Sequence, residues 1–445
     1  MLNKITSEQI TTNKHFEQLV DNYLSRLFPI TRSISGEGNR EALRILQEIV
    51  PIQIKEFPSG SEVYDWVVPD EWLVRDAWIK DADGKRLVDF QKSNLHLVSH
   101  SIAVQKLISF PDLEPRLHYL DHLPEAIPYR TSYYKKNWGF CVTKAQFETL
   151  KASKGPLEVR VDSEFLSNGS LPVGELLIPG ESKKEILISP YICHPSLAND
   201  NLSGVILTAF LAKELLQKKL KFSYRFIFAP ETIGAIAYCA KNETIMKSID
   251  TGLIVSCVGG PGKFSYKQSF DKSHYINFLT EEVFRDEKIQ FSTYPFDIHG
   301  SDERQYSSQG FRINTTTICK DKYYEYSYYH TSLDNLKFVN AKNIVHSLEL
   351  YLKLINKLED VSIFKSLVPN CEVMLSKHGL YPEVGGAIVP GKDSHQELDL
   401  ILWLLFYCDG KMSLYQISKK ISKPFKDLYK TALILEKKNI LKKIN

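Results

Sequence analysis

The sequence predicts an α/β protein whose mixed, mostly parallel sheet is flanked by helices and carries a β-rich inserted domain. Two apolar runs, 185–193 and 224–229, are bounded by polar residues, which is typical of strands buried in a parallel sheet. Between them, residues 205–216 have the pattern of a helix packed on the sheet. A chain of 445 residues is long enough for several domains.

The N-terminal segment also fits the main sheet. Apolar residues recur at helical spacing between Phe16 and Leu27. The polar, glycine-containing segment 31–39 separates that helix from a second one over 40–50. Residues 52–64 then have the pattern of a strand that returns to the sheet.

Residues 65–148 have a different pattern, with short alternating apolar runs, many aromatic residues and frequent turns. Asp83-Gly84 is a hairpin signal, and the aromatic segments 127–134 and 138–141 add further strand or loop. We therefore predict a β-rich insertion over 65–148, which divides the α/β catalytic domain into 1–64 and 149–365.

The C-terminal part follows a proline- and glycine-rich connector, 366–394. Amphipathic helices are predicted over 397–407, 413–421 and 425–436, and a strand over 439–444. This order, over 395–445, resembles a small winged helix-turn-helix.

Residues 411–445 contain ten lysines against Asp427 and Glu436, so nucleic acid is one candidate partner of this module. The predicted recognition helix has no Arg, Gln or Asn to read base edges. We therefore do not favour nucleic acid and expect a protein partner, a second copy of the chain included.

Composition predicts a soluble cytoplasmic protein. The longest apolar stretches are too short to span a bilayer, and the N-terminus lacks the apolar core of a signal peptide, so no membrane partner is expected. The seven cysteines are scattered without a close pair, which favours a reducing compartment.

Three short segments carry side chains that suit one metal site. His194 follows the first apolar run, Asp200 lies in the polar loop behind it, Glu231 follows the second run, and His330 lies in a third segment. In open α/β sheets, ligands bind at the carboxyl ends of strands. Two imidazoles and a carboxylate form a good zinc set, and a further Glu can activate a water. The sequence therefore predicts a metallohydrolase.

These segments resemble the co-catalytic zinc aminopeptidases, the superfamily of bacterial leucyl aminopeptidase and glutamate carboxypeptidase. Residues 200–204 (Asp-Asn-Leu-Ser-Gly) are similar to its metal-bridging motif, residues 329–334 to its terminal His motif, and residues 300–302 to the segment before that motif. The chain also resembles a bacterial group with an aminopeptidase-like core, a β insertion and a winged-helix tail. The resemblance implies a zinc exopeptidase-like fold whose insertion walls the active-site cleft.

The chain departs from this family at several carboxylates. The departures are Thr232 for the second Glu of a Glu-Glu pair, Ser256 or Cys257 for an Asp that ends a strand, and Ser196 for the Asp of a His-x-Asp motif. The ligands that remain are His194, Asp200 and His330. Three ligands with an open position suit one catalytic zinc, so we favour one ion over two.

We expect a zinc-dependent hydrolase, an aminopeptidase or amidase, that acts on a small peptide or amino-acyl substrate with a metal-activated water. Glu231 is the predicted general base, and Asp302 is a second predicted catalytic residue that orients the site. Predicted substrate contacts are Glu303, Arg304 and Tyr329.

The alternative is a degenerate peptidase fold that acts as a ligand sensor or docking protein with winged-helix output. The lost carboxylates favour this reading, whereas the retained ligands and base argue against it. A second metal cluster of His96, His118 and His122 is disfavoured, because the last two would share a face only on a helix and their surroundings are not helical in pattern.

Overall fold

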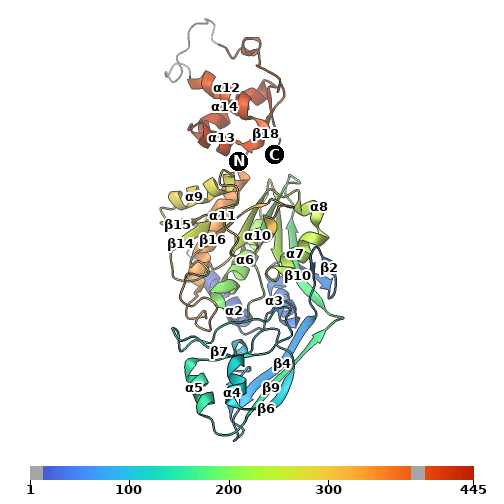
Figure 1. Ribbon diagram of the computed structural model, residues 1–445. Helices are drawn as coiled ribbons and strands as arrows, with labels where there is room; N and C mark the ends of the chain where they lie inside the picture. Colours follow the sequence, from blue (N-terminus) through green and yellow to red (C-terminus); the bar gives the residue numbers. More distant parts are fainter. Residues whose placement is uncertain (1–13, 382–395, 445) are drawn as a thin grey trace. The chain divides into compact units, whose positions relative to one another are not determined.

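The computed structural model describes residues 14–381 and 396–444. Within them, eight strands form one mixed sheet in the order β1-β10-β12-β11-β13-β16-β14-β15 (Figure 1). The four central strands run parallel: β12 (Ser223–Phe228), β11 (Glu185–Ser189), β13 (Thr251–Val255) and β16 (Asn314–Cys319). The outer strands are β1 (Gln53–Pro58), β10 (Ser170–Ile178), β14 (Phe264–Lys267) and β15 (Phe291–Tyr294). The predicted mixed sheet is confirmed.

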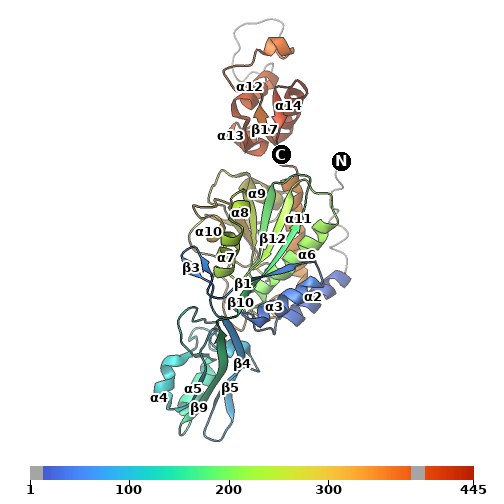
Figure 2. The ribbon, with the colours of Figure 1, turned by 90° about the vertical axis from the view of Figure 1, so that its right-hand side faces the viewer.

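Helices cover both faces of this sheet, which explains why its central strands are apolar on both sides. Figure 2 shows α2 (Lys14–Leu27), α3 (Glu37–Gln47) and α6 (Gly204–Leu216) on one face, and α7 (Ile233–Lys241) and α10 (Glu303–Tyr306) on the other. On α11 (Ala341–Glu359), the Tyr351 hydroxyl donates to the carbonyl oxygens of Ile254 and Ile318 in the sheet.

The inserted segment has its own sheet, in the order β5-β4-β9-β6. The predicted hairpin joins β4 (Glu71–Lys80) to β5 (Arg86–Asp89), and Gly84 in its turn has a φ of 81°. A separate buried core lies against this sheet. The other elements of this part are β2 (Glu62–Val63), β3 (Trp66–Val67), β6 (Val104–Ile108), α4 (Phe110–Leu113), β7 (Leu117–His118) and β8 (Phe140–Cys141).

The insertion's sheet extends past the predicted boundary at residue 148. Helix α5 (Lys144–Ala152) leads into β9 (Leu157–Leu166), which pairs with both β4 and β6. In β9, buried residues alternate with less buried ones, as expected of an antiparallel strand with one packed face. The segment 127–134, predicted as strand or loop, is a loop with isolated bridges.

His100 in this part makes stability depend on pH. Its ring is 1% exposed, stacks on Trp72 at 5.2 Å, and has no hydrogen-bond partner for either nitrogen among the described residues. Burial lowers its pKa to about 4. Below the ordinary value of about 6.5 the unfolded state therefore binds more protons, so stability is expected to fall between about pH 6.5 and pH 4, by at most about 1.4 kcal/mol per pH unit for one proton.

His100→Asn should flatten this slope, because asparagine does not titrate and tolerates the left-handed φ of 65° found here. Trp66, Trp72, Trp78 and Trp138 all lie near or in the inserted segment, so tryptophan fluorescence melts of variant and wild type across this pH range measure the effect. The same pH slope in both proteins would contradict it.

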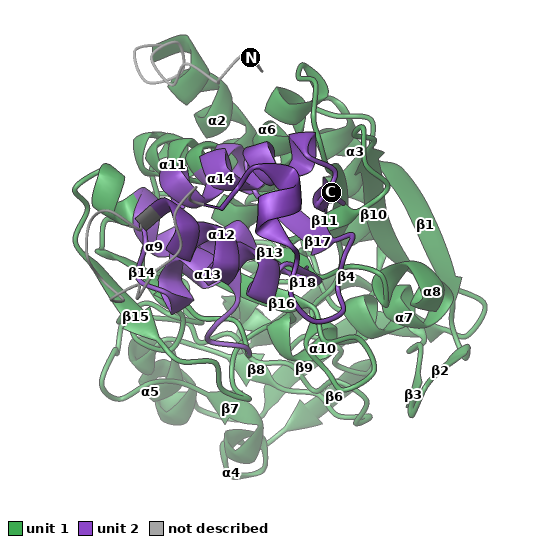
Figure 3. Ribbon diagram, turned by 90° about the horizontal axis from the view of Figure 1, so that it is seen from above, with its two compact units in different colours: residues 1–270, 284–353 green, residues 271–283, 354–445 purple. Residues whose placement is uncertain are grey.

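A second compact unit comprises residues 271–283 and 354–445 (Figure 3). It contains a three-stranded sheet, β18 (Asp409–Ser413), β17 (Ile363–Ser366) and β19 (Leu441–Lys443), together with η4 (Leu375–His378). Its helices α12 (Gln396–Tyr407), α13 (Leu414–Lys420) and α14 (Phe425–Lys437) surround a separate buried core. This is the predicted winged helix-turn-helix.

The middle strand of this small sheet comes from before the predicted connector. β17 pairs with β18 and with β19, although the sequence-based boundary assigned residues up to 365 to the catalytic domain. A four-residue strand is too short to show a period on its own. Residues 382–394 of the predicted connector lie outside the described residues.

The remaining helices are α8 (Glu243–Met246) and α9 (Tyr275–Asp286). Among the helices that the structure describes, none combines the length and apolar character needed to cross a bilayer.

Candidate metal centre

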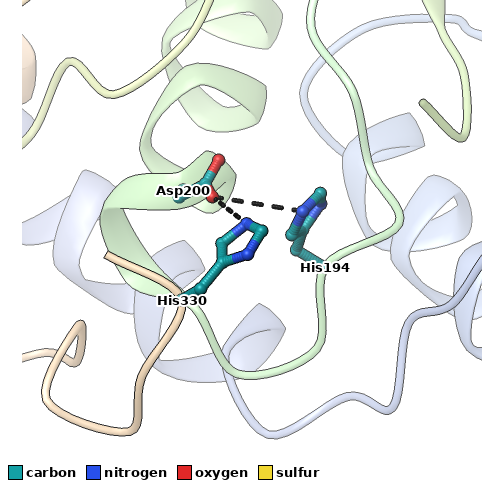
Figure 4. Close-up of side chains that lie close together, drawn as sticks. All are labelled: His194, Asp200 and His330. Carbon is teal, nitrogen blue, oxygen red and sulfur yellow. Dashed lines mark ion pairs between the residues drawn. The ribbon is translucent and has the colours of Figure 1, made fainter. Parts of the chain in front are cut away.

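The three predicted ligands converge at the carboxyl end of the main sheet (Figure 4). His194 follows β11, Asp200 lies in η3 (Ala198–Ser203), which leads into α6, and His330 lies in the loop after β16. Asp200 Oδ2 is 2.9 Å from His330 Nε2 and 4.0 Å from His194 Nε2. One ligand atom from each residue lies within 4.8 Å of the other two.

These side chains fit a zinc ion. Asp200 Oδ2 and His330 Nε2 are buried and face each other at 2.9 Å, with no other hydrogen-bond partner among the described residues, and a cation bound to both would satisfy them. Burial raises the pKa of Asp200, but the two imidazoles outweigh it and hold that pKa below its usual value. Burial lowers the pKa of His194 to about 4, so this imidazole is neutral at pH 7 and can act as a ligand.

The loop that carries Asp200 is fastened to the end of β13 by its own motif. The Cys257 N–H donates to Asn201 Oδ1 at 3.2 Å, and Asn201 Nδ2 donates to the Val255 carbonyl at 2.8 Å. A Cβ at Gly204 would lie 2.5 Å from that carbonyl oxygen, so glycine is required. The Asn and Gly of the Asp-Asn-x-Ser-Gly pattern thus hold the Asp200 loop against the backbone at the end of β13.

Two further residues hold the ligand backbone. Arg32 is 2% exposed and donates to the His194 carbonyl through Nε at 3.1 Å and Nη2 at 2.8 Å. Asp334 accepts the N–H groups of Asn199 and Asp200, at 2.6 and 3.0 Å. Asp334 therefore links the His330 loop to the Asp200 loop.

Strained backbone gathers around the same site. Non-glycine residues with left-handed φ are Ser196 (44°), Thr232 (64°), Cys257 (54°) and His330 (54°). Such conformations cost free energy and persist where the surrounding contacts enforce them, most often at functional sites.

Glu231 and Asp302 form a pair of neighbouring carboxyl groups. Asp302 is 1% exposed, and its Oδ1 accepts the Thr232 N–H at 2.7 Å. Burial, and then the charge of Asp200, raise the pKa of Glu231 to about 7, although the Ser301 hydroxyl opposes this. Burial and then Glu231 raise the pKa of Asp302 well above its usual value. A carboxyl group poised near neutrality suits a general base.

The predicted substrate contacts fall in different surroundings. Glu303 is 2% exposed and accepts from Lys267 Nζ at 2.9 Å and from the Tyr323 hydroxyl at 3.1 Å. Glu303 therefore anchors its own loop. This structural role replaces the predicted substrate contact of Glu303. Arg304 is exposed, and Tyr329 stacks on the His330 ring at 3.9 Å. Both remain predicted substrate contacts.

Tyr129, from the inserted segment, also reaches the site. Its ring centroid lies 5.2 Å from that of His194 and 5.1 Å from that of His330, and its N–H donates to the His330 carbonyl at 2.8 Å. Among the described residues, His96, His118 and His122 form no metal cluster. Nδ1 of His96 lies 2.8 Å from the Cys141 carbonyl oxygen instead.

Replacing Asp334 should weaken the site without touching a ligand. Asp334→Asn leaves one oxygen for two buried N–H donors, and an unsatisfied buried donor costs about 1–3 kcal/mol. We expect lower stability of the metal-free protein in urea, and zinc binding about 10-fold weaker by chelator competition. Asp321→Asn is the matched control, since Asp321 accepts a single backbone N–H, that of Gly262 at 2.9 Å. Equal behaviour of the two variants would contradict the role of Asp334.

Two family models match the chain. A family model described as a domain of unknown function, DUF4910, matches residues 21–361. The chain belongs to the DUF4910 family. A winged helix-turn-helix model matches residues 362–443, so this DUF4910 protein combines the family's domain with a C-terminal winged helix.

A protein sequence and a crystal structure, both from Clostridium acetobutylicum, are similar to this chain. One, described provisionally as a polysaccharide biosynthesis protein with an aminopeptidase-like domain, is 40% identical over 421 residues, which is 95% of each chain. The other is a crystal structure of a provisionally assigned peptidase, 37% identical with a TM-score of 0.80 over 98% of this chain and 99% of that one.

More distant solved structures share the fold. BSAP, a zinc aminopeptidase from Bacillus subtilis, is 12% identical with a TM-score of 0.57, over 78% of this chain and 94% of its own. A peptidase M28 precursor from Shewanella amazonensis is 13% identical with a TM-score of 0.54, over 87% and 97%. The DUF4910 protein therefore has an aminopeptidase-like fold.

Proposed function

We propose that this protein is a zinc-dependent amide hydrolase, an aminopeptidase or amidase. The observation that carries the proposal is the convergence of His194, Asp200 and His330 within 4.8 Å, beside a carboxyl group whose pKa is raised to about 7. The three ligands would hold one zinc ion, which supplies Lewis-acid chemistry when bound.

Other residues of the chain have separate roles in the proposed reaction. Glu231 takes a proton from the attacking water and passes it to the leaving amine. Asp302 holds the turn behind Glu231 through the Thr232 N–H. Tyr129 and Tyr329 flank the two imidazoles and would keep bulk water from them.

For the substrate we propose a small amino-acyl compound or peptide. Because one relative's description names polysaccharide biosynthesis, N-acylated amino sugars, which carry the same amide bond, belong in the substrate panel. Amino-acyl nitroanilides, dipeptides and N-acyl amino sugars should be assayed with and without a chelator. The proposal expects hydrolysis of at least one class, its loss on chelation, and its recovery on adding zinc.

The alternative function, a ligand sensor, makes a different prediction for the same panel. Zinc-loaded protein that binds a compound, detected as a thermal shift, but leaves it uncleaved would favour the sensor over the enzyme.

For the winged helix we propose a protein partner. Helix α12 leaves Leu402, Trp403 and Phe406 exposed, Phe406 by 75%, and exposed apolar side chains on one helix suit a protein contact. The lysines should give only weak, sequence-independent DNA binding that physiological salt abolishes. A gel-shift complex with one defined DNA sequence that survives such salt would contradict this.

A further inference from the structure

The two oxygens of Asp200 have different partners. Oδ2 faces the imidazoles of His330 and His194. Oδ1 instead accepts a hydrogen bond from the hydroxyl of Tyr191, a residue that is 4% exposed and packs against the His194 ring at 5.1 Å. Only Oδ2 is therefore open to a cation.

The phenol oxygen of Tyr191 has a second polar neighbour. Ser256 Oγ lies 2.8 Å from the phenol oxygen. The phenol proton points at Asp200, and the Ser256 hydroxyl also donates to Cys257 Sγ at 3.3 Å. Ser256, Tyr191 and Asp200 thus form one buried polar cluster beside Oδ1.

The space beside Oδ1 is occupied by neutral groups. Besides the phenol, the Cys257 thiol approaches Oδ1 at 4.0 Å, and Ser256 is fully buried behind them. In two-metal sites the ions lie about 3.5–4 Å apart, so a carboxylate that bridges them needs both oxygens. A second ion here would have to displace the buried phenol and would meet no carboxylate beyond Asp200 among these groups.

We propose that Tyr191 caps Oδ1 of Asp200 and thereby confines the site to one metal ion, held on Oδ2. Tyr191 is thus a positioning residue: it orients the carboxylate and excludes a second ion. This inference rests on the metal site of the proposed function, but metal binding measured without turnover tests it separately.

The first experiment compares zinc affinities. Metal-free protein is titrated with zinc against a chromophoric chelator, and the bound metal is counted by mass spectrometry. Tyr191→Phe should fold and still bind one ion, about 10- to 100-fold more weakly, because a ligating carboxylate loses its outer hydrogen-bond partner. Tyr129→Phe is the matched control: its ring packs on the same imidazoles, and its affinity should stay within about 2-fold of wild type.

A second pair of variants tests the exclusion of a second ion. Ser256→Asp alone should stay at one ion per chain, because the phenol still occupies Oδ1. Tyr191→Phe combined with Ser256→Asp frees that oxygen, adds a carboxylate and should bind two ions. A folded double variant that stays at one ion would contradict the cap.

The outcomes for wild type separate the two claims. Wild type that binds no zinc would overturn the metal site and the proposed function with it. Wild type that binds one zinc, together with a Tyr191→Phe affinity equal to that of Tyr129→Phe, would overturn only the role of Tyr191. Two ions in wild type would overturn the cap and leave the hydrolase proposal standing.

Discussion

Glu231→Gln should abolish hydrolysis while the protein keeps its zinc. The amide cannot accept the proton of the attacking water, and loss of a general base lowers rates by about 10²- to 10⁴-fold. The substitution is nearly isosteric and Glu231 is not one of the ligands, so zinc content and thermal stability should change little. Both are measured on the same preparation as the rate.

A matched control separates this effect from a general loss of a carboxylate. Glu243 begins α8, and its side chain is 43% exposed and paired with Lys247, so Glu243→Gln should keep full activity. A Glu231→Gln enzyme with more than about one tenth of the wild-type rate would show that another group is the base.

His330→Ala and Asp200→Asn should lose the metal itself. Each removes one of three ligands, so zinc affinity should fall by more than the 10- to 100-fold expected for an outer contact, and activity should fall to background. His330 is the cleaner test, because Asp200 also accepts the Tyr191 hydrogen bond. Circular dichroism establishes that each variant folds.

His122→Ala serves as the control for the metal experiment. His122 belongs to the histidine cluster that the sequence analysis disfavoured, and it is not among the three gathered ligands. Its replacement should leave one zinc per chain. Loss of zinc from His122→Ala, with retention in His330→Ala, would place the metal elsewhere.

Much of the fold was predictable because buried parallel strands are nearly continuous apolar runs. β11 and β12 coincide with the two apolar runs that the sequence analysis selected, and His194 and Glu231 follow their carboxyl ends. The C-terminal boundary of the insertion was harder to predict from the sequence. β9 alternates like the strands before it, but helix α5 separates it from them, and only pairing across the chain shows that it belongs to the same sheet.

The features of the site that could not be predicted from the sequence depend on contacts between residues far apart in the chain. Glu303 was predicted to contact substrate, yet Lys267, 36 residues earlier, pairs with its carboxylate. Tyr191 lies in an apolar run and has the pattern of a core residue, so its hydrogen bond to Asp200 could not be predicted. Arg32 likewise acts on His194 across 162 residues of chain.

The most direct test of the central claim is a crystal structure of protein purified without added metal, with anomalous data collected on both sides of the zinc absorption edge. We expect one zinc peak, about 2.0–2.2 Å from a nitrogen of His194, from Asp200 Oδ2 and from His330 Nε2, with Tyr191 still on Oδ1. A peak at other residues, or no peak after zinc is soaked in, would contradict the account.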